Sequence, residues 1–129
     1  MNIVAHRDQP LETWRAGVET RMQVSAASGA TQLCIFEQWV APGAGAPPHS
    51  HPVEEVLTVI AGEARMSLDG GNVVMGQGQS LVVPAGHRHG FQNVGSDMLH
   101  IHAVLASPIF EATFDGTTGP VRRWLPVES

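Results

Sequence analysis

Short apolar runs separated by glycine and proline dominate the sequence. Within several of these runs apolar and polar residues alternate, a period of two that is typical of β-strands with one buried face. Glycine and proline, 14 and 9 residues respectively, are spread along the whole chain and are expected to end strands at turns. The pattern predicts an all-β sandwich or barrel. The expected strands cover residues 18–26, 32–41, 55–61, 63–68, 72–75, 79–83, 90–94 and 98–106.

Three further segments lie outside these strands. Residues 10–17 are expected to form at most one helical turn, and residues 42–48, which consist of Gly, Ala and Pro, are expected to form a loop. The tail from Thr113 to Ser129 is rich in turn residues but also contains apolar side chains such as Trp124. An apolar tail of this kind is expected to pack either on its own barrel or on a neighbouring subunit.

Length, charge and cysteine content exclude several classes of protein. The 129 residues suit a single domain, and the net charge of −5 with no basic run argues against nucleic-acid binding. Cys34 is the single cysteine, so no internal disulfide can form and a reducing compartment fits. No apolar run is long enough to span a bilayer, and the N-terminus lacks the pattern of a signal peptide. We expect a soluble cytoplasmic protein that binds neither nucleic acid nor membrane.

His49, His51 and Glu55 lie close together in the sequence, and His89 follows in a separate segment. On an extended backbone residues i and i+2 point to the same side. His49 and His51 therefore share a face, and Glu55 joins them if the extended backbone continues. Three imidazoles and one carboxylate suit one divalent transition metal per chain: iron, manganese, nickel, copper, cobalt or zinc. Four protein ligands would leave one or two coordination positions free, as a catalytic metal requires.

The other interpretation of a His-x-His pair is two solvated loop residues, and an isolated pair would favour it. The carboxylate four residues later and the second histidine segment favour a metal instead. His87 fits equally well at the mouth of such a site or on a solvated turn. His100 and His102 alternate with more apolar residues, so they are expected to face outward, toward a subunit interface.

Two motifs in this region resemble those of the cupin superfamily, in particular small single-domain cupins with a barrel of the cupin 2 type. The first, Gly-x5-His-x-His-x3-Glu-x6-Gly, is matched by Gly43, His49, His51, Glu55 and Gly62. The second, Gly-x5-Pro-x-Gly-x2-His-x3-Asn, is matched by Gly78, Pro84, Gly86, His89 and Asn93. The resemblance implies a double-stranded β-helix, or jelly-roll, barrel. It also implies that His49, His51, Glu55 and His89 are metal ligands.

The same resemblance implies a single domain over residues 1–129. Its barrel core would cover about residues 32–107, with N- and C-terminal extensions packing on the barrel or on a dimer partner. Small cupins of this kind form dimers, so a homodimer is expected. By analogy with them, the even-numbered side chains of residues 32–41 would line the barrel, which would place Phe36 and Gln38 near the metal.

The favoured functional hypothesis is a metalloenzyme that acts on a small organic substrate. Its chemistry would be either dioxygenase-type oxidation or metal-assisted isomerase, lyase or cyclase chemistry. Candidate catalytic or orienting side chains are Glu55, His87 and Gln38, a short list that leaves most of the chemistry to the metal. The alternatives are a non-catalytic module that binds a small ligand and a metal that only stabilises the barrel. Because one barrel serves many functions, the fold does not choose among them.

Overall fold

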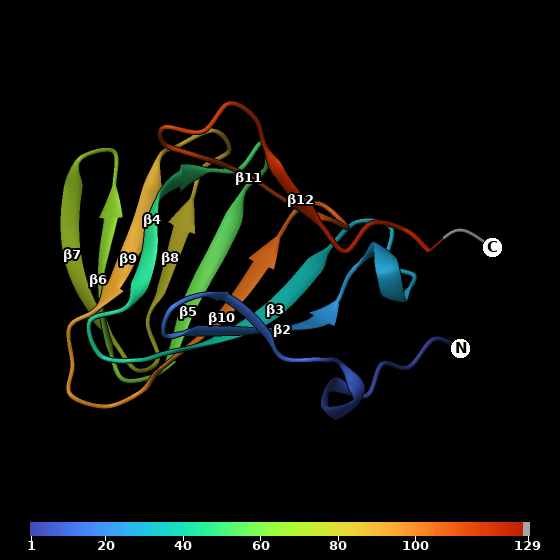
Figure 1. Cartoon of the computed structure of the whole chain (residues 1–129), viewed down its shortest axis with the longest axis horizontal. Helices are drawn as coiled ribbons and strands as arrows, with labels where there is room; N and C mark the ends of the chain where they lie inside the picture. The colour runs from blue at the N-terminus through green and yellow to red at the C-terminus, as the bar shows by residue number, and fades with distance from the viewer. Residues whose placement is uncertain (128–129) are drawn as a thin grey trace.

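The computed structural model describes residues 1–127, which form two antiparallel six-stranded sheets that face each other as a jelly roll (Figure 1). The first sheet contains, in spatial order, β1 (Glu12–Arg15), β2 (Val18–Val24), β3 (Cys34–Val40), β10 (Leu99–Leu105), β5 (Glu55–Ala61) and β8 (Ser80–Val83). The second contains β12 (Val121–Arg123), β11 (Phe110–Phe114), β4 (Gly45–Ser50), β9 (His89–Asn93), β6 (Glu63–Leu68) and β7 (Gly71–Gly76).

Helical structure is limited to two short 3-10 segments, His6–Asp8 and Ala26–Ser28, in the described part of the chain. Within residues 1–127, no helix has the length and apolar character needed to cross a membrane. Both ends of the described chain lie on the same side of the molecule (Figure 1).

The space between the two sheets holds the core, and alternation along the strands fills it. β3, β5 and β10 lie side by side, and each shows buried side chains at every second position. The even-numbered side chains of β3 face inward as expected, with Phe36 3% and Gln38 4% exposed. Cys34 is fully buried, and this burial, together with the charge of Glu55, raises the pKa of its thiol to about 12.

His100 and His102 point away from this core, which confirms the outward direction expected from the alternation. The ring of His100 stacks on that of Trp39 with centroids 4.9 Å apart. Its Nε2 lies 3.0 Å from Oε1 of Glu37. The outer face of this sheet therefore carries its own polar and aromatic layer, separate from the interior.

Most strands lie where the alternation predicts them, and β5 and β6 have the expected bounds. Two expectations about the early chain were wrong. Residues 12–15 form a strand instead of a helical turn, because they pair with β2. The segment expected to be a loop contains most of β4, Gly45–Ser50, including both prolines. A register irregularity between Ala46 and His49 accommodates them, since proline donates no hydrogen bond to a ladder.

The C-terminal segment is more ordered than its turn-rich composition indicates. β11 pairs with β4 on one side and with β12 on the other, which extends the second sheet. Trp124, just after β12, joins an aromatic cluster with Trp14, Phe36 and Phe110, whose ring centroids lie 4.7 to 5.9 Å apart. Trp124 therefore packs on its own barrel, whereas Leu125 and Val127 are exposed, and residues 128–129 lie outside the described residues.

Two glycines allow β4 and β9 to approach closely. A Cβ at Gly45 would lie 2.0 Å from the carbonyl oxygen of Phe91, and one at Gly90 would lie 2.7 Å from that of Ala46. Any other residue at these positions would push the strands apart. Their close pairing sets His49 directly opposite His89.

Candidate metal centre

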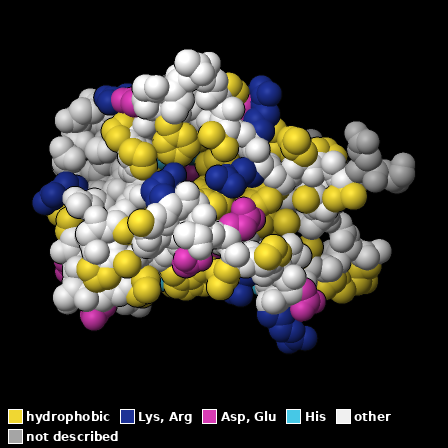
Figure 2. Space-filling model, viewed as in Figure 1, with side chains coloured by type: hydrophobic (Ala, Val, Ile, Leu, Met, Phe, Trp, Pro, Cys, Tyr) yellow, Lys and Arg dark blue, Asp and Glu magenta, His cyan; other side chains and the backbone are white. Residues whose placement is uncertain are grey.

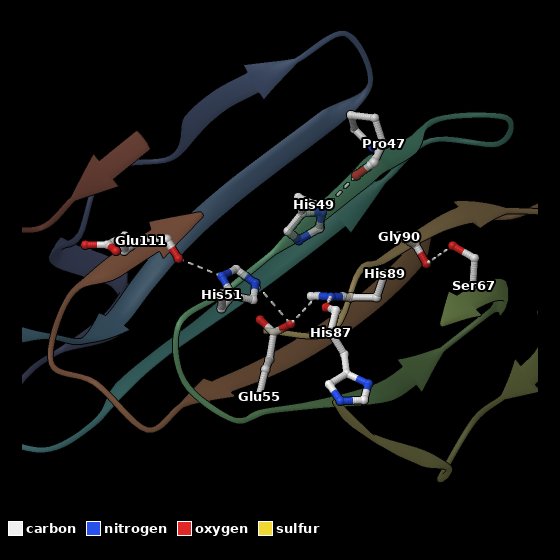
Figure 3. Close-up of polar contacts among 9 residues, drawn as sticks. All are labelled: Pro47, His49, His51, Glu55, Ser67, His87, His89, Gly90 and Glu111. Atoms are coloured by element: carbon white, nitrogen blue, oxygen red, sulfur yellow. Dashed lines mark hydrogen bonds and ion pairs between the residues drawn. The ribbon is translucent and has the colours of Figure 1, made fainter. Parts of the chain in front are cut away.

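Three strand ends bring the four predicted ligands together between the sheets. His49 lies on β4 and His51 just beyond its end, Glu55 begins β5, and His89 begins β9. One ligand atom from each lies within 4.8 Å of the others, and all four side chains are at least 94% shielded from solvent. Figure 3 shows the four side chains pointing toward a common centre.

The route by which Glu55 reaches this centre differs from the sequence expectation. An extended backbone does not continue from His51 to Glu55, because the chain turns after β4 and crosses from the second sheet to the first. Glu55 therefore faces the histidines from the opposite sheet. It does begin the expected inward apolar row, followed by Leu57 and Val59, which are 4% and 0% exposed.

Backbone carbonyls fix the orientation of the three imidazoles (Figure 3). The Nδ1 atoms of His49, His51 and His89 lie 2.8, 2.8 and 3.0 Å from the carbonyl oxygens of Pro47, Glu111 and His87. A carbonyl oxygen only accepts hydrogen bonds, so each Nδ1 must carry a proton and donate it. In the neutral tautomer the lone pair is then on Nε2. Three lone pairs are thus directed inward, as ligands of a metal require.

The position of the Glu55 carboxylate indicates whether this arrangement fits a cation. Its Oε1 lies 3.0 Å from Nε2 of His89 and 3.3 Å from Nε2 of His51. The His51 nitrogen is buried and has no well-aligned hydrogen-bond partner among the described residues. Carboxylate oxygens and imidazole lone pairs repel each other unless a proton or a cation lies between them. A divalent metal satisfies all of these atoms at once, so the residues present fit one.

The environment keeps Glu55 and His49 in the forms that bind a metal. Burial alone would raise the pKa of Glu55, but His51 and His89 outweigh it and lower this pKa to about 2. Burial and the neighbouring His89 lower the pKa of His49 to about 4. At neutral pH the carboxylate is therefore charged and the His49 imidazole is neutral.

A small chamber surrounds the four side chains, and we call it the inner chamber. Its free volume is about 20 Å³, which is roughly the space that one water molecule needs. Apart from the four polar residues and Gln38, its walls are largely apolar and aromatic, with Phe36, Leu57, Phe91, Phe110 and Phe114 among them. Such walls exclude water and strengthen electrostatic interactions at the centre.

The other two predicted catalytic candidates have different positions. Gln38 lines the inner chamber, and its amide donates a hydrogen bond to the buried Thr20 hydroxyl at 3.0 Å. His87 is exposed, and its Nδ1 lies 2.6 Å from Oδ2 of Asp69, outside the chamber. Its ring points away from the cluster in Figure 3. His87 therefore contributes its backbone carbonyl to His89, while its side chain lies on the solvated turn.

Several wall residues were missed by sequence reasoning. Trp14 and Arg15 come from β1, and Phe110 and Phe114 come from β11. The alternation of Phe110, Ala112 and Phe114 is a strand signal that was available but short. Nothing in the sequence near Arg15 indicates that it reaches a site formed by residues far along the chain.

Two Streptomyces proteins are similar to this chain in sequence. The chain is 35% identical over 79 residues to "Polyketide synthase CurC" of Streptomyces cyaneus, covering 60% of this chain and 49% of that protein. It is 34% identical over 94 residues to "Protein SchB" of Streptomyces halstedii, covering 72% of this chain and 68% of that one. The chain thus spans about half the length of CurC.

Solved structures show the same architecture. The polyketide cyclase RemF from Streptomyces resistomycificus has a TM-score of 0.71 at 25% identity, covering 81% of this chain and 78% of that chain. An RmlC-like cupin from Shewanella frigidimarina has a TM-score of 0.72 at 22% identity, covering 84% of this chain and 91% of that chain, a likeness of fold alone. The family model for the cupin domain matches residues 36–105, more than half of the sequence. On its fold, its two motifs and this match, the chain belongs to the cupin family.

Proposed function

We propose that this cupin is a metal-dependent enzyme that acts on a small organic substrate. His49, His51, Glu55 and His89 would hold one divalent transition metal. The observation that carries the proposal is the orientation of the imidazoles, each with Nδ1 bound to a backbone carbonyl and Nε2 directed inward. When bound, such a metal acts as a Lewis acid toward a carbonyl or enolate oxygen of the substrate.

Within this class, we favour cyclase-type chemistry on a polyketone over dioxygenase-type oxidation. Two of the similar proteins carry polyketide names, the synthase CurC and the cyclase RemF. In a cyclisation of this type an acidic C–H between two carbonyls loses its proton. The resulting carbanion forms a C–C bond to a second carbonyl carbon, and the oxygen of that carbonyl takes up a proton. The reaction needs no oxidant, and apolar aromatic walls suit an unsaturated substrate.

The protein's own side chains would mainly position the substrate and exclude water. The inner chamber admits only the reacting end of a substrate, since its free volume is about 20 Å³. Gln38, held by Thr20, would orient a polar group there. Glu55 is the only carboxylate among the described residues lining this chamber, so it is the base candidate once it has left the metal. The exposed His87 side chain has no part in this scheme.

Metal content provides the first test. Untagged protein purified without chelator is analysed by mass spectrometry, beside His51→Ala and the matched control His102→Ala, whose imidazole points outward on β10. We expect close to one iron, manganese, nickel, copper, cobalt or zinc ion per chain in the wild type and the control. We expect less than about a tenth of that in His51→Ala, because the loss of one of four ligands leaves an incomplete site.

Activity provides the second test. A 1,3-diketone is incubated in deuterium oxide with metal-loaded protein, and exchange at its central carbon is followed by NMR. Exchange that is faster than with His51→Ala supports carbanion chemistry. Metal binding without exchange, oxygen consumption or any other turnover would favour the non-catalytic ligand-binding module. Failure to bind any of the six metals after reconstitution would overturn the proposal.

A further inference from the structure

A second, larger cavity adjoins the inner chamber, and we call it the outer pocket. Its volume is about 390 Å³. Trp14, Arg15, Phe110 and Phe114 line both cavities, so the two share a wall. Figure 2 shows basic and apolar side chains side by side around a hollow in the surface. The outer pocket is therefore the adjacent space available to the body of a molecule whose reacting end lies at the metal centre.

The charges that line the outer pocket do not balance. Arg15 forms no ion pair with any carboxylate of residues 1–127, although it is only partly exposed. Its guanidinium has a long contact of 3.4 Å with the carbonyl oxygen of Gly45 and lies 5.4 Å from the ring centroid of Phe114. The carboxylate on the pocket wall, Asp115, is already paired with Arg88.

Arg123 adds a second guanidinium to the same wall. It lies over the ring of Trp14, 4.4 Å from the centroid, and 3.7 Å from Oε1 of Glu12. Its Nε is buried and has no hydrogen-bond partner in the described structure. Glu12 is shared, because it also accepts hydrogen bonds from the indoles of Trp14 and Trp124, at 3.2 and 2.8 Å. The carboxylate of Glu12 is thus divided between Arg123 and two indoles.

The proximity of Arg15 and Arg123 is itself unfavourable without an anion. Burial lowers the pKa of Arg15, and the charge of Arg123 lowers it further, although Arg15 remains protonated. An unpaired cation in a partly buried position is costly, and an anion placed beside it relieves the cost. This excess of positive charge occurs in a chain whose net charge is −5, so it is a local feature.

We propose that the outer pocket binds the carboxylate of a planar, unsaturated carboxylic acid, held by Arg15 with Arg123 beside it. A guanidinium presents its N–H groups in a planar fork that matches both carboxylate oxygens. The rings of Trp14, Phe110 and Phe114 form flat apolar walls on which an unsaturated body packs. As the substrate class of the metal centre this rests on the proposed function, whereas the binding itself does not.

The test compares two probes of the same shape. 2-Naphthoate carries the carboxylate, and 2-naphthamide replaces it with a neutral amide. Each is titrated into the full chain, with and without metal, and binding is followed by tryptophan fluorescence, since Trp14 lies in the pocket wall. We expect naphthoate to bind at least about tenfold more tightly than naphthamide, as for a charge-assisted bidentate contact. The preference should persist in the metal-free protein, because the guanidinium groups are the receptor.

Single substitutions show which residues produce the preference for naphthoate over naphthamide. Arg15→Met should reduce the affinity ratio of naphthoate to naphthamide to about twofold or less. Naphthamide should still bind, because the apolar walls are intact. Arg15→Lys should keep part of the preference for naphthoate, since the positive charge remains but the planar pair of guanidinium donors is lost. It also guards against a folding defect in Arg15→Met. Arg65→Met, an exposed arginine on β6 outside both cavities, is the matched control and should behave as the wild type.

The inference is overturned by equal binding of the two probes, by an undiminished preference in Arg15→Met, or by no naphthoate binding at millimolar concentration. A preference that disappears when metal is removed would also overturn it, because the carboxylate would then bind the metal, and the proposed function would survive. Conversely, the protein could prefer naphthoate over naphthamide and yet bind no metal and show no turnover. That result would support this inference and overturn the proposed function.

Discussion

The inner chamber and the outer pocket meet at one wall but are built from different parts of the chain. The ligands of the inner chamber lie within residues 36–105, the part matched by the cupin model. The outer pocket is formed mostly by β1, β11 and β12, outside that match. The family core therefore holds the candidate metal ligands, whereas the terminal strands determine which molecules can approach them.

The two regions also differ in how their polar groups are held. Each imidazole of the inner chamber is fixed by a backbone carbonyl, and its ligand atoms are shielded from solvent. The guanidinium groups of the outer pocket have a surplus of donors and too few acceptors. Besides the shared wall, a hydrogen bond joins the regions, since His51 is oriented by the carbonyl of Glu111 on β11. The terminal strands therefore also support the metal centre.

Removing the ring of Phe110 from the wall shared by the two cavities should produce the largest effect on stability. Phe110 is 3% exposed and contacts the rings of Trp14, Phe36 and Trp124. We expect Phe110→Ala to lower the free energy of unfolding by about 3 kcal/mol, the transfer and cavity cost of a buried phenylalanine. Urea denaturation of the metal-free protein measures it.

A control for this variant is available on β12. Val121 is 36% exposed at the rim of the outer pocket, so Val121→Ala should change the free energy of unfolding by about 0.5 kcal/mol or less. If Phe110→Ala costs no more than Val121→Ala, the terminal strands are not packed on the core as described, and the distinction between the two regions weakens.

Acidification should weaken metal binding in the inner chamber but not carboxylate binding in the outer pocket. Burial would lower the pKa of His51, but the adjacent Glu55 carboxylate and the Glu111 carbonyl outweigh it and raise this pKa above the ordinary 6.5. His51 therefore takes up a proton that a metal must displace. Below the pKa of His51, the apparent dissociation constant of the metal should rise by at least about tenfold per pH unit.

Metal titrations between pH 8 and 5 check this expectation. Naphthoate binding to metal-free protein serves as the comparison over the same range, because a guanidinium group keeps its charge there. Metal affinity that does not change with pH would show that no proton competes at the imidazoles. It would contradict the assignment of His51 as a metal ligand with a raised pKa.

The smallest effect is expected at His87, just outside the inner chamber. Its side chain is on the surface beside Asp69, and only its backbone carbonyl supports His89. His87→Ala should therefore change metal affinity by no more than about twofold, as for a surface substitution. Isothermal titration with the metal found in the wild type measures it, and a tenfold loss would place the His87 side chain at the centre after all.

The strands near the two motifs could be predicted because their signals are local. The alternation of Glu55, Leu57 and Val59 indicates which side is buried, and the structure confirms it. The outward direction of His100 and His102 follows from the same rule. β4 could not be predicted in this way, since Pro47 and Pro48 resemble a loop until β9 and β11 are paired on either side of it. β1 likewise is a strand because β2 lies beside it.

By itself the sequence determined the four candidate ligands and the all-β architecture. Motif spacing and a period of two are properties of neighbouring residues, and they survive without knowledge of the fold. Only the tertiary structure decided that Glu55 faces the histidines from the opposite sheet and that His87 does not join them. It also decided that Arg15 and Arg123, from opposite ends of the chain, share one pocket. Such positions depend on long-range strand pairing, which no local pattern encodes.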